Sequence, residues 1–282
     1  KSLLRLLAAA ALLPACVSAQ TLVSDSFADA ERSTQNLPSS LQWFASFSSS
    51  MSVSSGALRL SPTNNTVRAA TAYFTPVALE LGQAITLSLT FTPTVTAETN
   101  SPNGLRLGLF DSDGARLTGD GNPTDNTYRG YAVFLNPLTN SARIFERVGT
   151  GALLTSLGND IYDTANPLAS GSAVGETLRF EAGESYTASL TVARTTDNRW
   201  LIGFALSGGN IGSYSFWGED TANVVTRFDT ISFGLNSDMG ATDFTNVSVT
   251  LTAIPEPGTY AALVGVAALV GAACQRRFRR KA

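Results

Sequence analysis

Short runs in which apolar and polar residues alternate with a period of two recur between residues 20 and 253. The clearest run, AITLSLTFTP, begins at Ala84 and places every second residue from Ile85 to Phe91 on one apolar face. RWLIGFALS, which begins at Arg199, repeats the pattern. Such alternation over four to eight residues is typical of a half-buried β-strand, and Thr, Val, Phe and Tyr favour strands. No window of a dozen residues in this region has strong helical periodicity, so we predict an all-β domain.

Clusters of Gly, Asn, Asp and Pro, such as SPTNN, GDGNPTDN and SGGN, separate the alternating runs and are turn signals. We expect about twelve to fourteen strands, and so many strands in one domain require two packed sheets or a barrel. No repeat at a fixed period is evident, which argues against a propeller or a β-helix. We therefore predict a two-sheet antiparallel β-sandwich, a jelly roll, over residues 20–253.

The first and last runs of this domain resemble those of the concanavalin-like and laminin-G-like jelly rolls. They are TLVSDSF, at 21–27, and FDTISFGLNSDMGATDFTNVSVTLT, at 228–252. The resemblance implies that the last strand pairs near the first. This fold includes lectins, carbohydrate-binding modules, glycosidases and inert adhesion modules, so the fold alone selects none of these functions.

The domain is acidic and lacks several reactive side chains. The chain has no histidine, and its two cysteines, Cys16 and Cys274, lie outside residues 20–253. Histidine-dependent triads, imidazole metal sites and thiol nucleophiles are therefore excluded. Seven of the 19 basic residues and one of the 22 acidic residues lie outside the domain, which leaves 12 arginines and 21 acids, a net charge of about −9. This charge disfavours nucleic acid and anionic lipid as partners.

Residues 1–19 have the features of a cleaved signal peptide. Lys1 and Arg5 form a positive end, Leu6–Leu13 is an apolar segment too short to span a bilayer, and Val17-Ser18-Ala19 is a small-residue cleavage site. A lipoprotein leader is the alternative, because Leu-Pro-Ala-Cys, ending at Cys16, loosely matches a lipobox.

Residues 254–282 have three parts in a fixed order. Pro255-Glu256-Pro257 precedes an uncharged apolar run, Tyr260–Cys274, and a basic cluster follows. A helix over this run would be about 22 Å long against a bilayer core of about 30 Å, and snorkelling or local thinning can cover that deficit. The predicted membrane anchor includes Tyr260, Leu263, Val264, Val266, Leu269 and Val270. The basic flank, which marks a cytoplasmic side, is Arg276, Arg277, Arg279, Arg280 and Lys281. A buried core helix is the alternative.

This three-part tail resembles the PEP-CTERM sorting signal of Gram-negative bacteria in order, spacing and position. The resemblance implies recognition of Pro255, Glu256 and Pro257 by an exosortase, a membrane protease that processes such tails. It implies an exported protein that is tethered to the inner membrane by the helix at about 260–274, with its basic tail at 276–281. After processing, the protein would reach the cell surface or the extracellular matrix. The resemblance implies nothing about the activity of the domain.

A glycosidase on this fold would need two carboxylates about 5 to 9 Å apart. The jelly-roll glucanases carry them on one strand as Glu-x-Asp-x-x-Glu or Glu-x-Asp-x-Glu, and no such run occurs here. The nearest doublets are Glu181/Glu184 and Glu219/Asp220. We therefore predict no catalytic residues and no enzyme activity. A polysaccharide-active hydrolase or lyase is the alternative.

Four aspartates, Asp111, Asp113, Asp120 and Asp125, lie close together in FDSDGARLTGDGNPTDN. Calcium takes six to eight oxygen ligands, and clustered carboxylates suit it. The run matches only the start of an EF-hand loop, because Asn122 stands where a bidentate glutamate is expected. A hairpin turn is the favoured alternative. We predict no cofactor, and a structural calcium ion at these four aspartates stays a hypothesis.

In SYSFWGED the alternation places Trp217 on the face opposite the two preceding aromatic residues, beside Glu219 and Asp220. A tryptophan at the rim of a sandwich can stack on a sugar ring while nearby carboxylates accept hydroxyl hydrogen bonds. These three residues are our candidate ligand-binding group, and the alternative places Trp217 in the core. Trp200, in mid-alternation, is predicted to be core, and the place of Trp43 stays open.

Taken together, these features predict a non-catalytic binding or structural module of the cell surface or extracellular matrix. Extracellular polysaccharide is the ligand that the candidate group fits. A structural domain without a ligand is a further alternative.

Overall fold

The computed structural model describes residues 19–33, 37–54, 56–63, 66–96, 104–124, 127–136, 141–156, 158, 161–172, 178–236 and 239–254. Nearly all of the predicted signal peptide and the whole of the predicted sorting motif, anchor and basic flank lie outside these residues. The chain divides into two compact units, 1–19 with 252–282 and 20–251. The second unit carries the fold.

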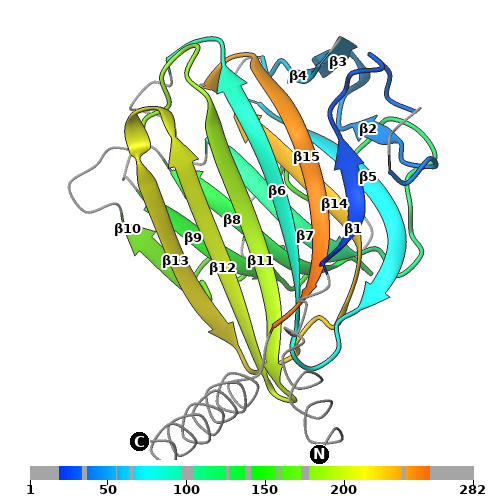
Figure 1. Cartoon of the computed structure of the whole chain (residues 1–282), viewed down its shortest axis with the longest axis vertical. Coiled ribbons are helices and arrows are strands. Elements are labelled where there is room, and N and C mark those ends of the chain that lie inside the picture. The colour runs from blue at the N-terminus through cyan, green and yellow to red at the C-terminus, as the bar shows by residue number, and fades with distance from the viewer. Residues whose placement is uncertain are drawn as a thin grey trace, which may run out of the picture. The chain divides into compact units, whose positions relative to one another are not determined.

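Two β-sheets form this unit (Figure 1). The strands of the eight-stranded sheet are β1 (Ala19–Asp25), β3 (Met51–Ser54), β4 (Ala57–Leu60), β6 (Gln83–Pro93), β11 (Tyr186–Thr196), β12 (Arg199–Gly208), β13 (Ser213–Asp220) and β15 (Thr242–Ala253). Their order is β13-β12-β11-β6-β15-β4-β3, and β1 also pairs with β15. The pairing of the last strand with the first, which the resemblance to jelly rolls implied, is therefore present.

The seven-stranded sheet lies behind the first in Figure 1. Its strands are β2 (Trp43–Ala45), β5 (Val67–Ala78), β7 (Leu105–Asp111), β8 (Arg129–Asn136), β9 (Ser141–Arg147), β10 (Ala169–Ser172) and β14 (Arg227–Asn236). Their order is β10-β9-β8-β7-β14-β5-β2. The strand pairs with a described register are antiparallel in both sheets. The predicted two-sheet antiparallel sandwich is thus confirmed.

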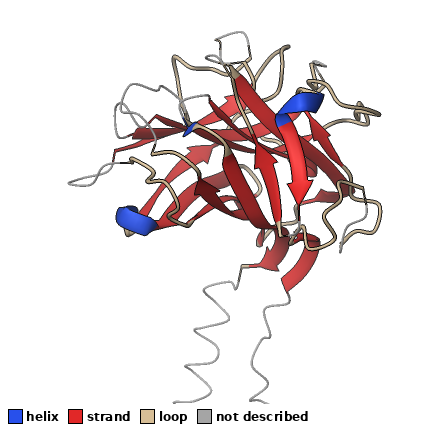
Figure 2. Cartoon of the chain, turned by 90° about the horizontal axis from the view of Figure 1, so that it is seen from above, coloured by secondary structure: helices blue, strands red, loops and turns tan. Residues whose placement is uncertain are grey.

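Helix is confined to short pieces in the described part of the chain (Figure 2). The 3-10 turns η2 (Ser48–Ser50) and η4 (Gly209–Ile211) each have three residues. No helix among the described residues is long and apolar enough to cross a membrane.

The main core lies between the two sheets and follows the alternation seen in the sequence. In β6 the predicted apolar face, Ile85 to Phe91 at every second residue, is fully buried. Trp200 is fully buried, as predicted, and Trp43, whose place was open, is 1% exposed in the same core. Burying one large apolar side chain contributes about 1.5 to 3 kcal/mol, so this layer supplies most of the favourable free energy of folding.

The seven-stranded sheet is covered on both faces. Nearly every residue of β7, β8 and β14 is buried, without the alternation that marks a half-buried strand. The segments that follow β7 and β9 fold over its outer face and form a second core with aromatic residues of the sheet. That core includes Phe44, Tyr73, Phe110, Tyr128, Phe134, Phe145, Leu153, Leu154 and Tyr162. The eight-stranded sheet is therefore the one whose outer face carries the alternating exposed residues.

Candidate functional site

Strand β13 presents Trp217 on the outer face of the eight-stranded sheet. Exposed and buried residues alternate along the strand, and Trp217 is 56% exposed whereas Tyr214 is 9% exposed. The predicted separation of Trp217 from the two preceding aromatic residues is therefore confirmed. The alternative that placed Trp217 in the core is wrong.

The indole of Trp217 lies across the backbone of the neighbouring strand β12. Trp217 pairs in register with Gly203. A Cβ atom added to Gly203 would lie 2.3, 2.4 and 2.5 Å from three atoms of the six-membered ring of Trp217. Since these three distances are nearly equal, the ring covers that position flat rather than on edge. Glycine at 203 thus makes room for the ring, and the opposite side of the ring faces solvent.

Short hydroxyl side chains continue the same row across the sheet. Thr191 of β11 pairs with Gly203, and Thr86 of β6 pairs with Thr191. The hydroxyl oxygens of Thr86 and Thr191 lie 2.9 Å apart, within hydrogen-bond distance. Each hydroxyl has one donor and two acceptor positions, so this pair keeps capacity for a further partner.

Two further rows lie beside this one, displaced by two residues each along the strands. The pairing places Ser215, Ala205, Ser189 and Ser88 in the nearer row, and Ser213, Ser207, Thr187 and Thr90 in the next. All eight are exposed or half-exposed, and none is charged. We call the outer surface of β13, β12, β11 and β6 formed by these three rows, including Trp217, the hydroxyl face.

An ion pair borders the hydroxyl face on the other side of Trp217. Arg199 donates a hydrogen bond to Glu219, and the two side chains are 50% and 47% exposed. The hydrogen bond from Arg199 lowers the pKa of Glu219, so the carboxylate is ionised and already partnered at neutral pH. Glu219 thus lies next to Trp217, as predicted.

Asp220 does not belong to this surface, and the prediction that grouped it with Trp217 needs correction. Because successive residues of a strand point to opposite faces, Asp220 points between the sheets and is 3% exposed. Its carboxylate accepts hydrogen bonds from the Tyr131 hydroxyl, at 2.7 Å, and from the Ala222 amide, at 3.0 Å. Glu219 and Asp220 therefore cannot act together on one bond. The other doublet, Glu181 and Glu184, lies in an exposed turn before β11.

A second acid lies near Asp220 between the sheets. Glu146 of β9 pairs in register with Tyr131 of β8 and is half-buried. Burial, together with the negative charge of Asp220, raises the pKa of Glu146 to about 7, while Arg129 acts in the opposite direction. Burial also raises the pKa of Tyr131, so its hydroxyl remains a hydrogen-bond donor to Asp220.

This raised pKa predicts a stability that falls between about pH 4.5 and pH 7. The protonated form of Glu146 is favoured in the folded state, so its contribution is complete below the unfolded pKa and is lost as the pH rises through about 7. Replacing Glu146 with Gln is therefore expected to raise the free energy of unfolding at about pH 8 by about 1 kcal/mol, after allowance for partial exposure. Urea unfolding at about pH 5 and about pH 8 measures this difference. The exposed Glu184→Gln variant is the control, and equal pH dependence in wild type and Glu146→Gln would contradict the assignment.

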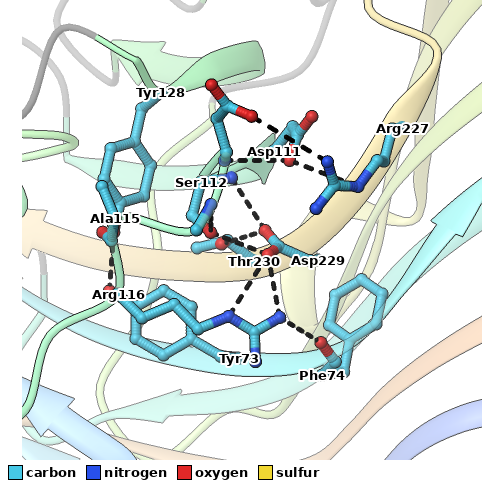
Figure 3. A network of polar contacts seen from close by, with 12 residues as sticks. Tyr73, Phe74, Asp111, Ser112, Ala115, Arg116, Tyr128, Arg227, Asp229 and Thr230 are labelled. Carbon is cyan, nitrogen blue, oxygen red and sulfur yellow. Dashed lines mark hydrogen bonds and ion pairs between the residues drawn. The ribbon is translucent and has the colours of Figure 1, made fainter.

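The aspartates considered for calcium are divided between two places, and Figure 3 shows the first of them, where Asp111 lies close to Arg227. Asp111 and Asp113 face Arg227, with nitrogen–oxygen distances of 3.8 and 4.0 Å. Asp120 instead pairs with Arg32 at 3.0 Å and accepts a hydrogen bond from the Ala45 amide.

The segment around Asp111 has the geometry of a turn. Asp111 accepts a hydrogen bond from the Asp113 amide at 3.0 Å, and Asp113 and Gly114 have φ values of 48° and 84°. With Thr127 and Arg129, the two aspartates line a cavity of about 420 Å³. Over the described part of the chain no three His, Cys, Asp or Glu side chains are grouped to hold a metal, and Asp125 lies outside that part. A calcium ion stays a hypothesis, tested by the melting temperature with calcium and with chelator.

Comparisons with known proteins concern the fold. No family model and no curated protein matches the chain. Among solved structures, the metal-free form of lectin I-B4 from Griffonia simplicifolia is 14% identical over 81% of this chain and 99% of that chain, with a TM-score of 0.47. Lectin I from Ulex europaeus, in complex with the methyl glycoside of α-L-fucose, is 11% identical over 84% and 98%, with a TM-score of 0.46. The Emp47p carbohydrate recognition domain is 13% identical over 83% and 94%, with a TM-score of 0.47.

Proposed function

We propose that this domain is a non-catalytic carbohydrate-binding module and that the hydroxyl face is its binding surface. The observation that carries the proposal is the indole of Trp217, which lies flat over Gly203 and is 56% exposed. Of the three tryptophans, Trp217 is the exposed one, and the other two are almost completely buried. A flat ring in this position can stack on the C–H face of a sugar, and the neighbouring hydroxyls can exchange hydrogen bonds with the sugar hydroxyls.

The chemistry of the surface supports binding rather than catalysis. Hydrolysis of a glycosidic bond by the common mechanism needs two carboxylates on either side of that bond. Glu219 is the carboxylate next to Trp217, and it is held by Arg199 while Asp220 points into the sandwich. A binder needs only the stacking ring and hydroxyl partners, which the hydroxyl face supplies.

The proposal also covers the cellular location of the protein. Pro255-Glu256-Pro257, the apolar run Tyr260–Cys274 and the basic residues 276–281 support export, tethering at the inner membrane and exosortase processing. The acidic domain, with its net charge of about −9, favours an uncharged extracellular polysaccharide as its partner. The mass of the processed protein tests this part, because replacement of Pro255-Glu256-Pro257 is expected to block processing.

Replacing Trp217 with Ala is expected to weaken retention on a polysaccharide affinity gel by about tenfold or more, because truncating an aromatic anchor removes much of the contact energy. The melting temperature of the full chain is expected to change little, since the side chain is mostly exposed and packs on a glycine. Affinity electrophoresis over a panel of neutral polysaccharides, with melting curves in parallel, measures both.

Phe47 provides the matched control for this substitution. It is an exposed aromatic residue, 58% exposed, just before η2 and outside the hydroxyl face. Phe47→Ala is expected to leave retention unchanged. Retention of Trp217→Ala equal to that of wild type would refute the proposed surface, and turnover that is lost in Glu219→Gln would refute the non-catalytic role.

A further inference from the structure

The hydroxyl face has no walls. Apart from Trp217, its three rows contain only Gly, Ala, Ser and Thr, whose side chains are too short to rise around a ligand. The rows cross four adjacent strands, and three inter-strand spacings of about 4.8 Å make the face roughly 14 Å wide. A ligand on this face is therefore contacted from one side only, across a width of several strands.

One-sided contact suits a ligand that is already ordered. A dissolved sugar chain would lose conformational freedom on binding, and it would gain contacts on only one of its sides. A polysaccharide chain packed in a solid has already lost that freedom. The chains beside it in the solid can contact the outer rows of the face. Preorganisation of the ligand thus favours the solid over the dissolved form.

The protein side of this contact is ordered as well. The hydroxyls of Thr86 and Thr191 lie 2.9 Å apart, and those of Thr90 and Thr187 lie 3.4 Å apart. Threonine is β-branched and has few χ1 rotamers, so these side chains lose little entropy when a ligand binds. Residues on one face of a strand repeat about every 6.8 Å, which makes the hydroxyl rows regular.

The charge of the face limits the ligand further. None of the side chains in the three rows is charged, and the ion pair that borders them, Arg199 with Glu219, is internally neutral. An anionic polymer would be repelled by a domain of net charge about −9, and the cation at the border of the face, Arg199, is already paired with Glu219. The surface is thus complementary to an uncharged polymer.

From these features we infer that the hydroxyl face binds the surface of a solid, uncharged polysaccharide in which several chains lie side by side. The inference rests on the proposed function and names its ligand class. The dissolved oligosaccharides of the same sugar are expected to bind at least about tenfold more weakly than the solid.

The test compares one sugar in two physical forms. The full chain is mixed with microcrystalline cellulose or crystalline chitin, and with the corresponding soluble oligosaccharides as competitors. Sedimentation of the solid measures bound protein. We expect depletion of the protein by at least one solid and little competition by its oligosaccharides.

Two substitutions place a charge in the middle of the face without removing Trp217. Ala205 is exposed and Ser189 is half-exposed, so Ala205→Glu is the first variant and Ser189→Glu the second if the first does not fold. Either variant is expected to lower binding to the solid by about tenfold or more, because a buried, unpaired carboxylate would result. The exposed Ser54→Glu, on β3 of the same sheet, is the matched control and is expected to bind as wild type does.

The outcomes separate this inference from the proposed function. Equal affinity for solid and dissolved forms, with both lost in Trp217→Ala, would overturn the inference and leave the proposed function in place. Unchanged binding by both charged variants would also overturn the inference. Binding of neither form on any sugar tested would overturn both.

Discussion

Replacing Asp229 with Ala is expected to lower the free energy of unfolding by about 3 to 5 kcal/mol. Asp229 is fully buried on β14 and holds the turn that follows β7 (Figure 3). Its carboxylate accepts hydrogen bonds from the Ser112 amide at 2.8 Å and the Ser112 hydroxyl at 2.7 Å. It also accepts from the Thr230 hydroxyl at 2.7 Å and from Arg116 at 2.8 Å. Removal of the carboxylate leaves the buried Ser112 and Thr230 donors without this acceptor, and each unpaired buried donor costs about 1 to 3 kcal/mol. Arg116, whose side chain is 37% exposed, loses its ion pair as well.

The charge of Asp229 is part of this effect. Burial raises the pKa of Asp229, but the hydrogen bonds from Ser112, Thr230 and Arg116 outweigh burial and leave the pKa below its ordinary value. Because the folded pKa is lowered, the contribution of Asp229 is present above the unfolded pKa of about 4 and is lost as the pH falls through the folded pKa. Asp229→Asn keeps the size and loses the charge, so we expect about half the loss seen for Ala.

Urea unfolding of the full chain, followed by tryptophan fluorescence, measures both variants. Asp197→Ala is the control, since Asp197 also pairs with an arginine but its side chain is 82% exposed. That variant is expected to change stability by less than about 0.5 kcal/mol. A loss below about 1 kcal/mol in Asp229→Ala would show that the turn does not depend on this network.

The strands of the eight-stranded sheet were predictable because one of their faces is buried and the other is not. In β6 and β11 this difference appears in the sequence as an alternation of apolar and polar residues. The burial of the seven-stranded sheet on both faces was not predictable in the same way. Arg106 of β7 is an example, since it is 4% exposed, donates to the Leu154 carbonyl and lies 4.8 Å from the ring centre of Phe134. A segment almost fifty residues later covers it, and burial lowers its pKa to about 10.

Of the candidate site, only the features that lie within the single strand β13 were predictable from the sequence. Alternation within β13 places Trp217 outward, and the same alternation places Glu219 and Asp220 on opposite faces, so their grouping at one site was wrong. The support of Trp217 by Gly203, and the hydroxyl rows that reach Thr86, depend on the register between strands. A shift of one residue would turn a whole strand over, and the sequence of one chain does not show which register is formed.

For the aspartate cluster, closeness in the sequence did not predict which side chains would be partners in the structure. Asp120 is close in sequence to Asp111 and Asp113, yet it bonds to Arg32, which is 88 residues away. Ion pairs of this kind depend on which loops meet at one end of the sandwich. Local spacing raised the hypothesis of a single calcium site, with a hairpin turn as the favoured interpretation. In the structure, tertiary pairing engages the described aspartates with arginines.

Trp43 is the position at which loss of one side chain is expected to affect both sheets. It lies on β2 of the seven-stranded sheet, and its indole nitrogen donates to Asp25 of β1, in the eight-stranded sheet, at 2.7 Å. Its ring packs against Phe27 and Phe233, with ring centres 5.9 and 5.2 Å away. Trp43→Ala removes this packing and the hydrogen bond together, so we expect a loss of about 3 to 5 kcal/mol in the free energy of unfolding.

Trp43→Phe separates packing from hydrogen bonding. The smaller ring keeps much of the apolar contact, but the buried carboxylate of Asp25 loses the indole donor and keeps the hydrogen bond from the Phe27 amide, at 2.7 Å. Burial already raises the pKa of Asp25, and the hydrogen bond from Trp43 opposes that rise. We therefore expect Trp43→Phe to cost about 1 to 3 kcal/mol at neutral pH and less on acidification, because protonation relieves the unpaired charge. In a double-mutant cycle with Asp25→Asn, a coupling energy near zero would show that this hydrogen bond does not help to hold the two sheets together.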